Sequence, residues 1–118
     1  MQTLIILWQP NATWAALSDA EQKDYLRSLD TAVNEARSFG VMTLGWSKID
    51  QQISRAVEQG YVGVFAMSDE ESIRELDKNI EQSGWYDYFD SVNLSINPQG
   101  GTNPQPSEEY ARILNMEL

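Results

Sequence analysis

The sequence of 118 residues predicts a single α+β domain in which strands and helices follow one another in the order β-α-β-β-α-β. Four short segments are rich in branched and aromatic residues, as strands are. Two longer segments repeat apolar residues at helical spacing, and each begins with a capping signal and ends at a glycine. A chain of this length is large enough to bury a hydrophobic core of its own.

The first strand and the first helix are marked by signals at both ends. The strand covers residues 3–9 and stops at Pro10, which cannot donate a hydrogen bond to a sheet. The "PNATWAAL" segment that follows is expected to be a loop. Ser18 begins the helix with Glu21 at capping-box spacing, and Gly40 is expected just past its end. The apolar stripe of this helix comprises Tyr25, Leu26, Leu29, Ala32, Val33 and Ala36.

Residues 41–49 and 61–67 are the second and third predicted strands. The third, "YVGVFAM", is rich in branched and aromatic side chains. Residues 50–60 between them fit either a short helix or an irregular connection. In both cases the side chains expected to face the interior are Ile53, Ala56 and Val57.

The second helix is predicted to begin at Ser68, since Glu71 stands at capping-box spacing from it. Gly84 is expected to close this helix. Its apolar stripe comprises Ile73, Leu76 and Ile80. The helical spacing of these residues predicts one face packed against the sheet.

The fourth strand is predicted over residues 91–96, where polar and apolar residues alternate. Its apolar face would hold Val92, Leu94 and Ile96. Residues 1–97 are therefore expected to form the domain, and residues 98–118 a polar loop followed by a short helix. That helix is expected to be capped by Ser107 and to carry Tyr110, Ile113 and Leu114.

This order of elements is the split βαβ, or ferredoxin-like, arrangement, with the first and third strands in the centre of one antiparallel sheet. Both of these strands present apolar side chains on both faces, which requires cover on both sides. Two helices cover only one face, and soluble monomers rarely expose a large apolar patch. We therefore expect a homodimer that packs sheet against sheet with two-fold symmetry. In the alternative, residues 98–118 fold back over the open face.

The composition excludes several classes of chemistry. The chain has no cysteine and no histidine, which removes disulfides, thiolate catalysis and the commonest general base and metal ligand. A net charge of -10 opposes binding to nucleic acid and to anionic lipid. No signal peptide or membrane span is predicted, so a cytoplasmic location is expected. No cofactor and no metal site is expected either.

An aromatic cluster follows the second helix, with Trp85, Tyr86, Tyr88 and Phe89 within five positions. Aromatic residues just after a helix end usually fold beneath the helix and seal the core. The same rings are able to form one wall of a cleft. We expect the cluster to seal the core chiefly, and we take Trp85 and Tyr88 as candidate ligand contacts.

Two further residues are candidate ligand contacts. Trp46 stands beside Gly45 on a predicted edge strand, where a missing side chain leaves space against the sheet. Asn93 lies on the polar face of the last strand. Scattered tryptophans are more often anchors of a core or an interface, and a polar strand face is more often hydrated.

Candidates for a catalytic base are weak. Asp87 and Asp90 flank the aromatic cluster, and burial of either carboxylate would make it more basic. Tyr88 is the third candidate. A solvated surface position is the ordinary alternative for both carboxylates.

The order of elements, with an aromatic turn before the last strand, resembles the dimeric α+β barrel superfamily. More narrowly, "ATWAALSDAEQ" (residues 12–22) and "GWYDYFDSVN" (residues 84–93) are similar to uncharacterised short members, the darcynin-like group among them. The resemblance covers residues 1–97 and implies the ferredoxin-like fold and a dimer. The superfamily includes small monooxygenases, haem-degrading enzymes and lactone isomerases, so the resemblance implies no single activity.

The chain departs from the active members in one respect. Haem-binding members use a histidine ligand, which this sequence lacks. Cofactor-free oxygenases of the superfamily use tryptophan, asparagine, tyrosine and arginine, and Trp46, Asn93, Tyr88 and Arg74 supply those residue types by composition only.

The sequence therefore predicts a dimeric α+β barrel protein that binds a small organic molecule, apolar or aromatic, between sheet and helices. One alternative is a cofactor-independent monooxygenase or isomerase acting on an aromatic or lactone substrate. In that enzyme Trp46 and Asn93 would position the substrate. The other alternative is an acidic protein-interaction module that acts through the C-terminal helix.

Overall fold

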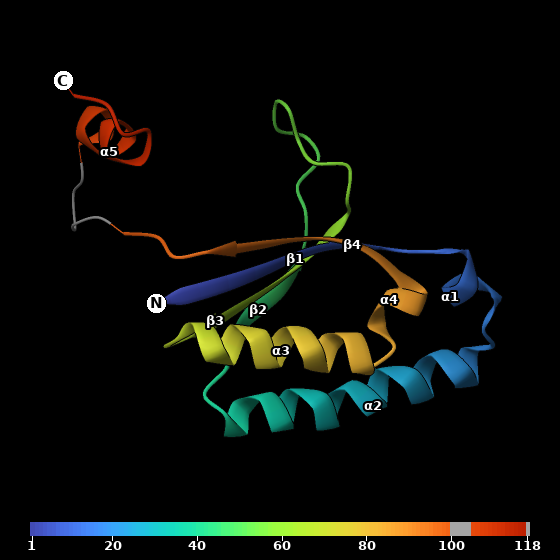
Figure 1. The fold of residues 1–118 in the computed structure, drawn as a ribbon. Coiled ribbons are helices and arrows are strands. Elements are labelled where there is room, and N and C mark those ends of the chain that lie inside the picture. Colours follow the sequence, from blue (N-terminus) through green and yellow to red (C-terminus); the bar gives the residue numbers. More distant parts are fainter. Residues whose placement is uncertain (100–104, 118) are drawn as a thin grey trace.

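The computed structural model describes residues 1–99 and 105–117 and contains one four-stranded antiparallel sheet. The strands are β1 (Gln2–Pro10), β2 (Met42–Lys48), β3 (Tyr61–Met67) and β4 (Phe89–Ile96), in the order β2-β3-β1-β4. Helices α2 (Asp19–Ser38) and α3 (Glu70–Gln82) lie side by side over one face of the sheet (Figure 1). The predicted ferredoxin-like fold is confirmed, with the first and third strands in the centre.

The pairing of the strands assigns each side chain to one face of the sheet. Ile6 is paired with Gly63 and Asn93, whereas its neighbour Ile5 is paired with Val64 and Leu94. Directly paired residues point to the same side of a sheet. Ile6 belongs to the buried cluster beneath the helices, so the Ile5 row faces away from them. We call this second side the open face; its apolar residues are Ile5, Leu7, Val62, Val64, Val92, Leu94 and Ile96.

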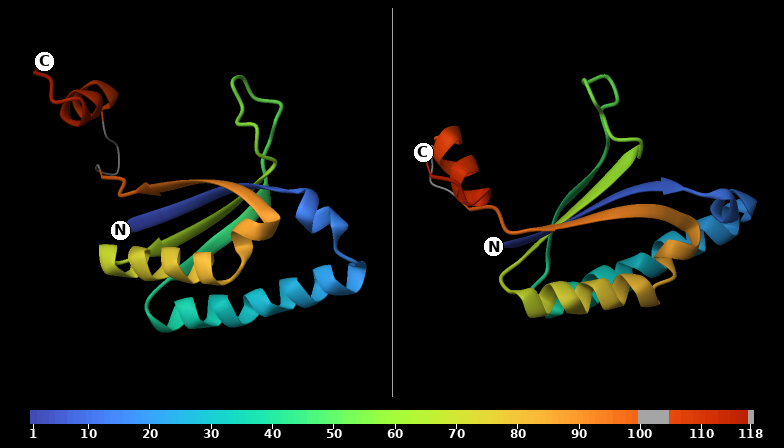
Figure 2. Two further views of the ribbon diagram at one scale, coloured as in Figure 1. Left: turned by 45° about the vertical axis from the view of Figure 1, so that its right-hand side comes forward. Right: turned by 45° about the horizontal axis from the view of Figure 1, so that its top comes forward.

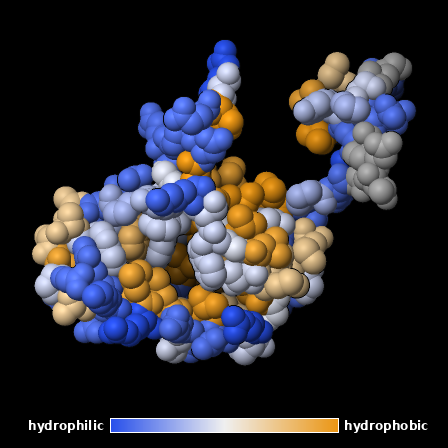
Figure 3. Space-filling view, turned by 180° about the vertical axis from the view of Figure 1, so that it is seen from behind, coloured by the Kyte–Doolittle hydropathy of each residue, from blue (hydrophilic) through white to orange (hydrophobic). Residues whose placement is uncertain are grey.

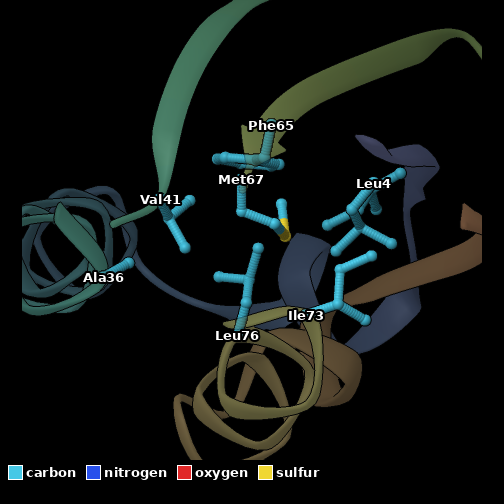
Figure 4. Close-up of a cluster of buried hydrophobic side chains, with 8 residues drawn as sticks. Leu4, Ala36, Val41, Phe65, Met67, Ile73 and Leu76 are labelled. Carbon is cyan, nitrogen blue, oxygen red and sulfur yellow. The ribbon is translucent and has the colours of Figure 1, made fainter. Parts of the chain in front are cut away.

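The hydrophobic core lies between α3 and the helix-covered side of the sheet (Figure 4). Ile73 and Leu76 of α3 are 3% and 5% exposed and confirm the predicted stripe of this helix. The strands contribute Leu4, Ile6, Phe65 and Met67. By contrast, Ala36 is the one buried residue of α2. Most of the apolar stripe of α2 is therefore not packed into the hydrophobic core.

The helix ends follow the predicted signals, with one correction. The capping box of Ser18 and Glu21 is present, and Gly40 and Gly84 follow the ends of α2 and α3 with φ of 95° and 80°. The prediction that Ser68 caps α3 was wrong. Asp69 is the cap, because its carboxylate reaches the backbone N–H of Ser72 at 2.8 Å and so satisfies a free donor of the first turn.

Three segments differ from the predicted elements. The expected loop after Pro10 contains a short helix, α1 (Ala12–Ala16), capped by Asn11, whose side chain accepts from the Trp14 N–H at 3.1 Å. The aromatic cluster begins with one helical turn, α4 (Trp85–Tyr88), and β4 starts directly after it at Phe89, two residues before the predicted strand. The prediction that Ser107 caps the last helix, α5 (Pro106–Ile113), was wrong: Gln105 occupies the N-cap position, and its side chain makes no capping hydrogen bond.

Residues 50–60 form the irregular one of the two predicted connections, and they project beyond the sheet (Figures 1 and 2). The Gln51 side chain closes this loop by donating to the carbonyl oxygens of Val57 and Gln59 at 3.1 and 2.7 Å. Ile53 and Val57 are 62% and 41% exposed, so the expectation that they face inward was wrong. A loop that leaves the sheet has no core to reach.

The open face has no cover within the described part of the chain. Val92, Leu94 and Ile96 are 49%, 44% and 39% exposed. Helix α5 stands off the end of the sheet instead of lying on it (Figures 1 and 2). The predicted polar loop falls partly on residues 100–104, outside the described residues. Within residues 1–99 and 105–117, none of the helices combines the length and the apolar character that crossing a membrane requires.

Candidate functional site

A cavity of about 580 Å³ lies between α2 and the helix-covered side of the sheet. Its lining comes from β1, β2, β3, α2, the end of α3 and the aromatic residues beside β4. Figure 3 shows this side of the molecule hollowed, with apolar residues around the hollow. The cavity explains why the apolar stripe of α2 is half-buried: Leu29, Ala32 and Val33 face the hollow.

Small residues form part of the cavity lining. Ala32 and Ala36 stand on the cavity side of α2, where a longer side chain would reach towards the sheet. Opposite them, Gly63 lies in the middle of β3. A Cβ atom at Gly63 would come within 3.1 Å of the Trp46 ring, so the absent side chain lets the indole lie against the strand. Ala32 and Gly63 thus line the hollow from opposite sides, and the space beside Gly63 is taken by the Trp46 ring.

Aromatic side chains form much of the cavity wall. They are Trp8, Trp46, Phe65, Trp85 and Phe89. Trp46 meets Phe65 edge to face with ring centroids 6.1 Å apart, yet the tryptophan is 59% exposed. Trp8 lies deeper and meets Trp85 in the same manner at 5.2 Å. Trp46 therefore borders the opening, and Trp8 and Trp85 border the interior.

The aromatic cluster also seals one end of the fold. Phe89 is 2% exposed and lies 4.1 Å from Trp85 and 4.8 Å from Trp14, measured between ring centroids. Trp85 Nε1 donates to Ser91 Oγ at 3.1 Å, which satisfies the one polar atom of the ring. The cluster therefore both closes the core and supplies Trp85 and Phe89 to the cavity wall.

Polar side chains in the lining are few. They are Asp30, Asn34 and Arg37 of α2, Thr43 of β2, and Asn79 and Ser83 of α3. Arg37 Nη1 donates to Asn34 Oδ1 at 3.2 Å. Among the described residues, no carboxylate lies within 4.0 Å of the Arg37 guanidinium. The site thus joins an apolar interior to one cationic group.

The structure places two of the four candidate ligand contacts in the cavity wall, namely Trp46 and Trp85. Asn93 instead donates from Nδ2 to the Tyr86 hydroxyl oxygen at 2.8 Å. Tyr88 packs against Tyr25 with centroids 4.7 Å apart. Neither Asn93 nor Tyr88 is part of the lining.

The candidate bases lie outside the cavity as well. Asp87 and Asp90 are both exposed. The Asp87 carbonyl oxygen and the Asp90 carboxylate accept hydrogen bonds from Asn11 Nδ2 at 3.0 and 3.4 Å. These contacts tie the end of β1 to α4 and β4. A catalytic role for Tyr88, Asp87 or Asp90 stays a prediction.

Sequence reasoning did not single out several residues of the cavity lining, among them Ala32, Gly63 and Arg37. Ala32 and Ala36 appear in the sequence as ordinary members of an apolar stripe, and Gly63 as a weak point in a strand. The sequence contained one signal for these residues, namely small side chains in two places. They are two alanines in the apolar stripe of one helix and a glycine in a central strand. Arg37 follows Ala36 directly, at the edge of the same stripe.

Burial raises the pKa of the Tyr25 hydroxyl, and a hydrogen bond with the Ser83 side chain partly opposes the shift. The pKa of Tyr25 is thus higher in the folded protein than in the unfolded chain, where it is about 10. The contribution of Tyr25 to stability is therefore fully present below about pH 10 and is lost as the pH rises through the folded-state pKa. We therefore expect the urea midpoint to fall above about pH 10. In Tyr25→Phe this fall should be smaller.

The measurement is urea unfolding followed by circular dichroism at several alkaline pH values. Tyr86 contributes a residual slope in the same direction, because burial also raises its pKa. Tyr110→Phe, at an exposed position of α5, is the matched control. Equal slopes for Tyr25→Phe and the unchanged protein would contradict the assignment to Tyr25.

Fold and site together define the class: a ferredoxin-like α+β domain with a mostly apolar cavity beneath its helices. The chain belongs to the family of unknown function DUF6616, whose family model matches residues 1–108. No curated protein matches the chain.

Several solved structures have the same fold at low sequence identity. The Arabidopsis thaliana protein At3g17210 has a TM-score of 0.62 at 9% identity, over 87% of this chain and 100% of that one. A heme-binding protein from Thermus thermophilus has a TM-score of 0.58 at 14% identity, over 87% of this chain and 45% of that one. A DABB-family protein with a ferredoxin-like fold from Mesorhizobium loti has a TM-score of 0.55 at 11% identity, over 84% and 97%. Such identities show the fold alone.

Proposed function

We propose that this protein binds a small organic molecule with an aromatic body in the cavity between α2 and the sheet. The observation that supports this function is the cavity itself, at about 580 Å³ and lined mostly by apolar side chains. Pockets for small organic ligands span roughly 300–1,000 Å³ and combine apolar walls with a few polar groups. The hollow beneath α2 has both properties.

The wall favours a flat, aromatic ligand over an aliphatic chain. Two aromatic pairs line the cavity and present ring faces and edges to it. One pair is Trp46 and Phe65, and the other, further inside, is Trp8 and Trp85. Aromatic pairs in stacked or edge-to-face geometry gain about 0.5–1.5 kcal/mol beyond the area they bury. An aromatic guest makes such contacts with several of these rings at once.

A heme ligand is not what we propose, although the Thermus thermophilus protein with this fold is described as heme-binding. The chain has no histidine and no cysteine to coordinate iron.

We propose further that, within the dimeric α+β barrel superfamily, the chain is related to the darcynin-like short proteins.

We propose further that the protein is a homodimer joined through the open face. The open face is apolar along β1, β3 and β4 and leaves Val92 and Leu94 almost half exposed. A second copy would cover it with an identical surface, which is the two-fold arrangement commonest among small proteins. The cavity lies on the opposite side of the sheet, so the dimer would leave both cavities open.

Filling the cavity is the test of ligand binding. In Ala32→Leu the larger side chain extends from α2 into the cavity. We expect this variant to bind the uncharged dye N-phenyl-1-naphthylamine about tenfold or more weakly, because leucine occupies space that the dye needs. The dye becomes fluorescent in apolar surroundings, so titration followed by fluorescence gives the dissociation constant.

The matched control is Ala20→Leu, which adds the same side chain at an exposed position of the same helix outside the cavity. The control should bind the dye like the unchanged protein. If the unchanged protein leaves the dye non-fluorescent, or if both variants bind it equally, the proposed function is wrong.

A further inference from the structure

We infer that the molecule bound in the cavity carries a carboxylate, and that Arg37 binds this group at the edge of the apolar space. The inference rests on the proposed function and names its ligand class: an aromatic carboxylic acid. Among the residues that the structure describes, Arg37 is the one cation in the lining. A cavity with apolar walls and a single cation fits a molecule with an apolar body and a single anionic group.

The surroundings of Arg37 differ from those of most other helical cations. Arg27, Lys78 and Arg112 each pair with a carboxylate three residues earlier, at Asp24, Glu75 and Glu109, with N–O distances of 3.3, 3.8 and 2.7 Å. Lys23 pairs with Asp19 at 2.8 Å in the same way, four residues earlier. Among the described residues of the helices, four of the six cations thus have a local carboxylate partner, and Arg37 and Arg74 do not. Of these two, Arg37 alone lines the cavity.

At Arg37 the residue three positions earlier is an amide, Asn34, and not a carboxylate. The amide oxygen accepts one hydrogen bond from Nη1 and leaves the positive charge of the guanidinium uncompensated. A guanidinium has five N–H donors, so the remaining ones can bind both oxygens of a carboxylate in the bidentate geometry typical of arginine. Asn34 thereby positions the donor without neutralising it.

Two opposing charges limit the strength of this interaction. Asp30 lies two turns earlier on the same side of α2 and also lines the cavity, and the whole chain carries a net charge of -10. Both charges repel an anion, and dissolved salt weakens this repulsion by screening. The carboxylate must therefore lie at the Arg37 end of the cavity, with the aromatic body extending towards Trp8 and Trp85 and away from bulk water.

The test compares two competitors of one shape. 2-Naphthoate and 2-naphthamide differ in charge and hardly in size, and each can displace N-phenyl-1-naphthylamine from the protein. We expect 2-naphthoate to bind about tenfold more tightly than the amide, because a hydrogen bond between two charged groups is stronger than one to a neutral group. Arg37→Gln should abolish this preference while leaving the dissociation constant of the amide unchanged.

Arg74→Gln is the matched control, since Arg74 is an exposed arginine of α3 that does not line the cavity. This variant should keep the preference for 2-naphthoate. Equal binding of the two competitors to the unchanged protein would overturn the inference and leave the proposed function standing. So would an equal loss of both competitors in Arg37→Gln, or preferential binding of the cation 2-naphthylmethylammonium. Failure of the dye itself to bind would overturn both.

Discussion

Replacing Phe89 by alanine is expected to lower the free energy of unfolding by about 3–5 kcal/mol, the range measured for buried aromatic residues. Phe89 is 2% exposed and lies at the junction of α4 and β4. Its ring is in contact with rings from three other parts of the chain: Trp8 of β1, Trp14 of α1 and Tyr25 of α2. Alanine leaves a void that these elements cannot fill together.

Urea unfolding followed by circular dichroism measures this loss. Tyr110→Ala removes a comparable ring from a position that is 65% exposed on α5, and it should change the free energy of unfolding by less than about 0.5 kcal/mol. A loss below about 1 kcal/mol in Phe89→Ala would mean that the aromatic cluster does not hold these elements together.

Leu94→Asp is expected to convert the proposed dimer into a monomer. Leu94 is 44% exposed at the open face, paired with Ile5 in the register of β1 and β4. In a sheet-to-sheet dimer a carboxylate at this position would be buried without a partner, which costs several kcal/mol. The dissociation constant should rise by about a hundredfold or more. Light scattering after size-exclusion chromatography reports the mass directly.

Ser95→Asp is the matched control, because it places the same charge one residue further along β4 on the other side of the sheet. This variant should elute with the mass of the unchanged protein. A monomeric mass for the unchanged protein at micromolar concentration would contradict the proposed dimer, and so would a dimeric mass for Leu94→Asp.

The fold could be predicted because its signals are local and agree with one another. Ser18 and Gly40 mark the ends of α2, and the apolar residues on both sides of β1 require a central strand. Where a signal could be satisfied by two neighbouring residues, the prediction was one residue off. Asp69 and Ser68 are both good caps, and only the path of the backbone decides between them.

The candidate site could be predicted only in part. Trp46 and Trp85 were recognised because large aromatic residues at strand edges and helix ends attract notice in a sequence. The cavity itself could not be predicted, because its lining comes from β1, β2, β3, α2 and α3, and these elements come together only in the tertiary structure. Asn93 was expected to contact a ligand. In the structure its side-chain amide donates a hydrogen bond to the Tyr86 hydroxyl oxygen, and Asn93 is not part of the cavity lining.

The position of the tryptophans gives the molecule a built-in optical reporter. Three of the four indoles, Trp8, Trp46 and Trp85, border the hollow under α2. Their emission depends on the polarity and the quenchers around each ring, so a guest that displaces water there changes both the colour and the intensity of the intrinsic signal. Occupancy can thus be followed by ultraviolet excitation of the native chain, with no label attached.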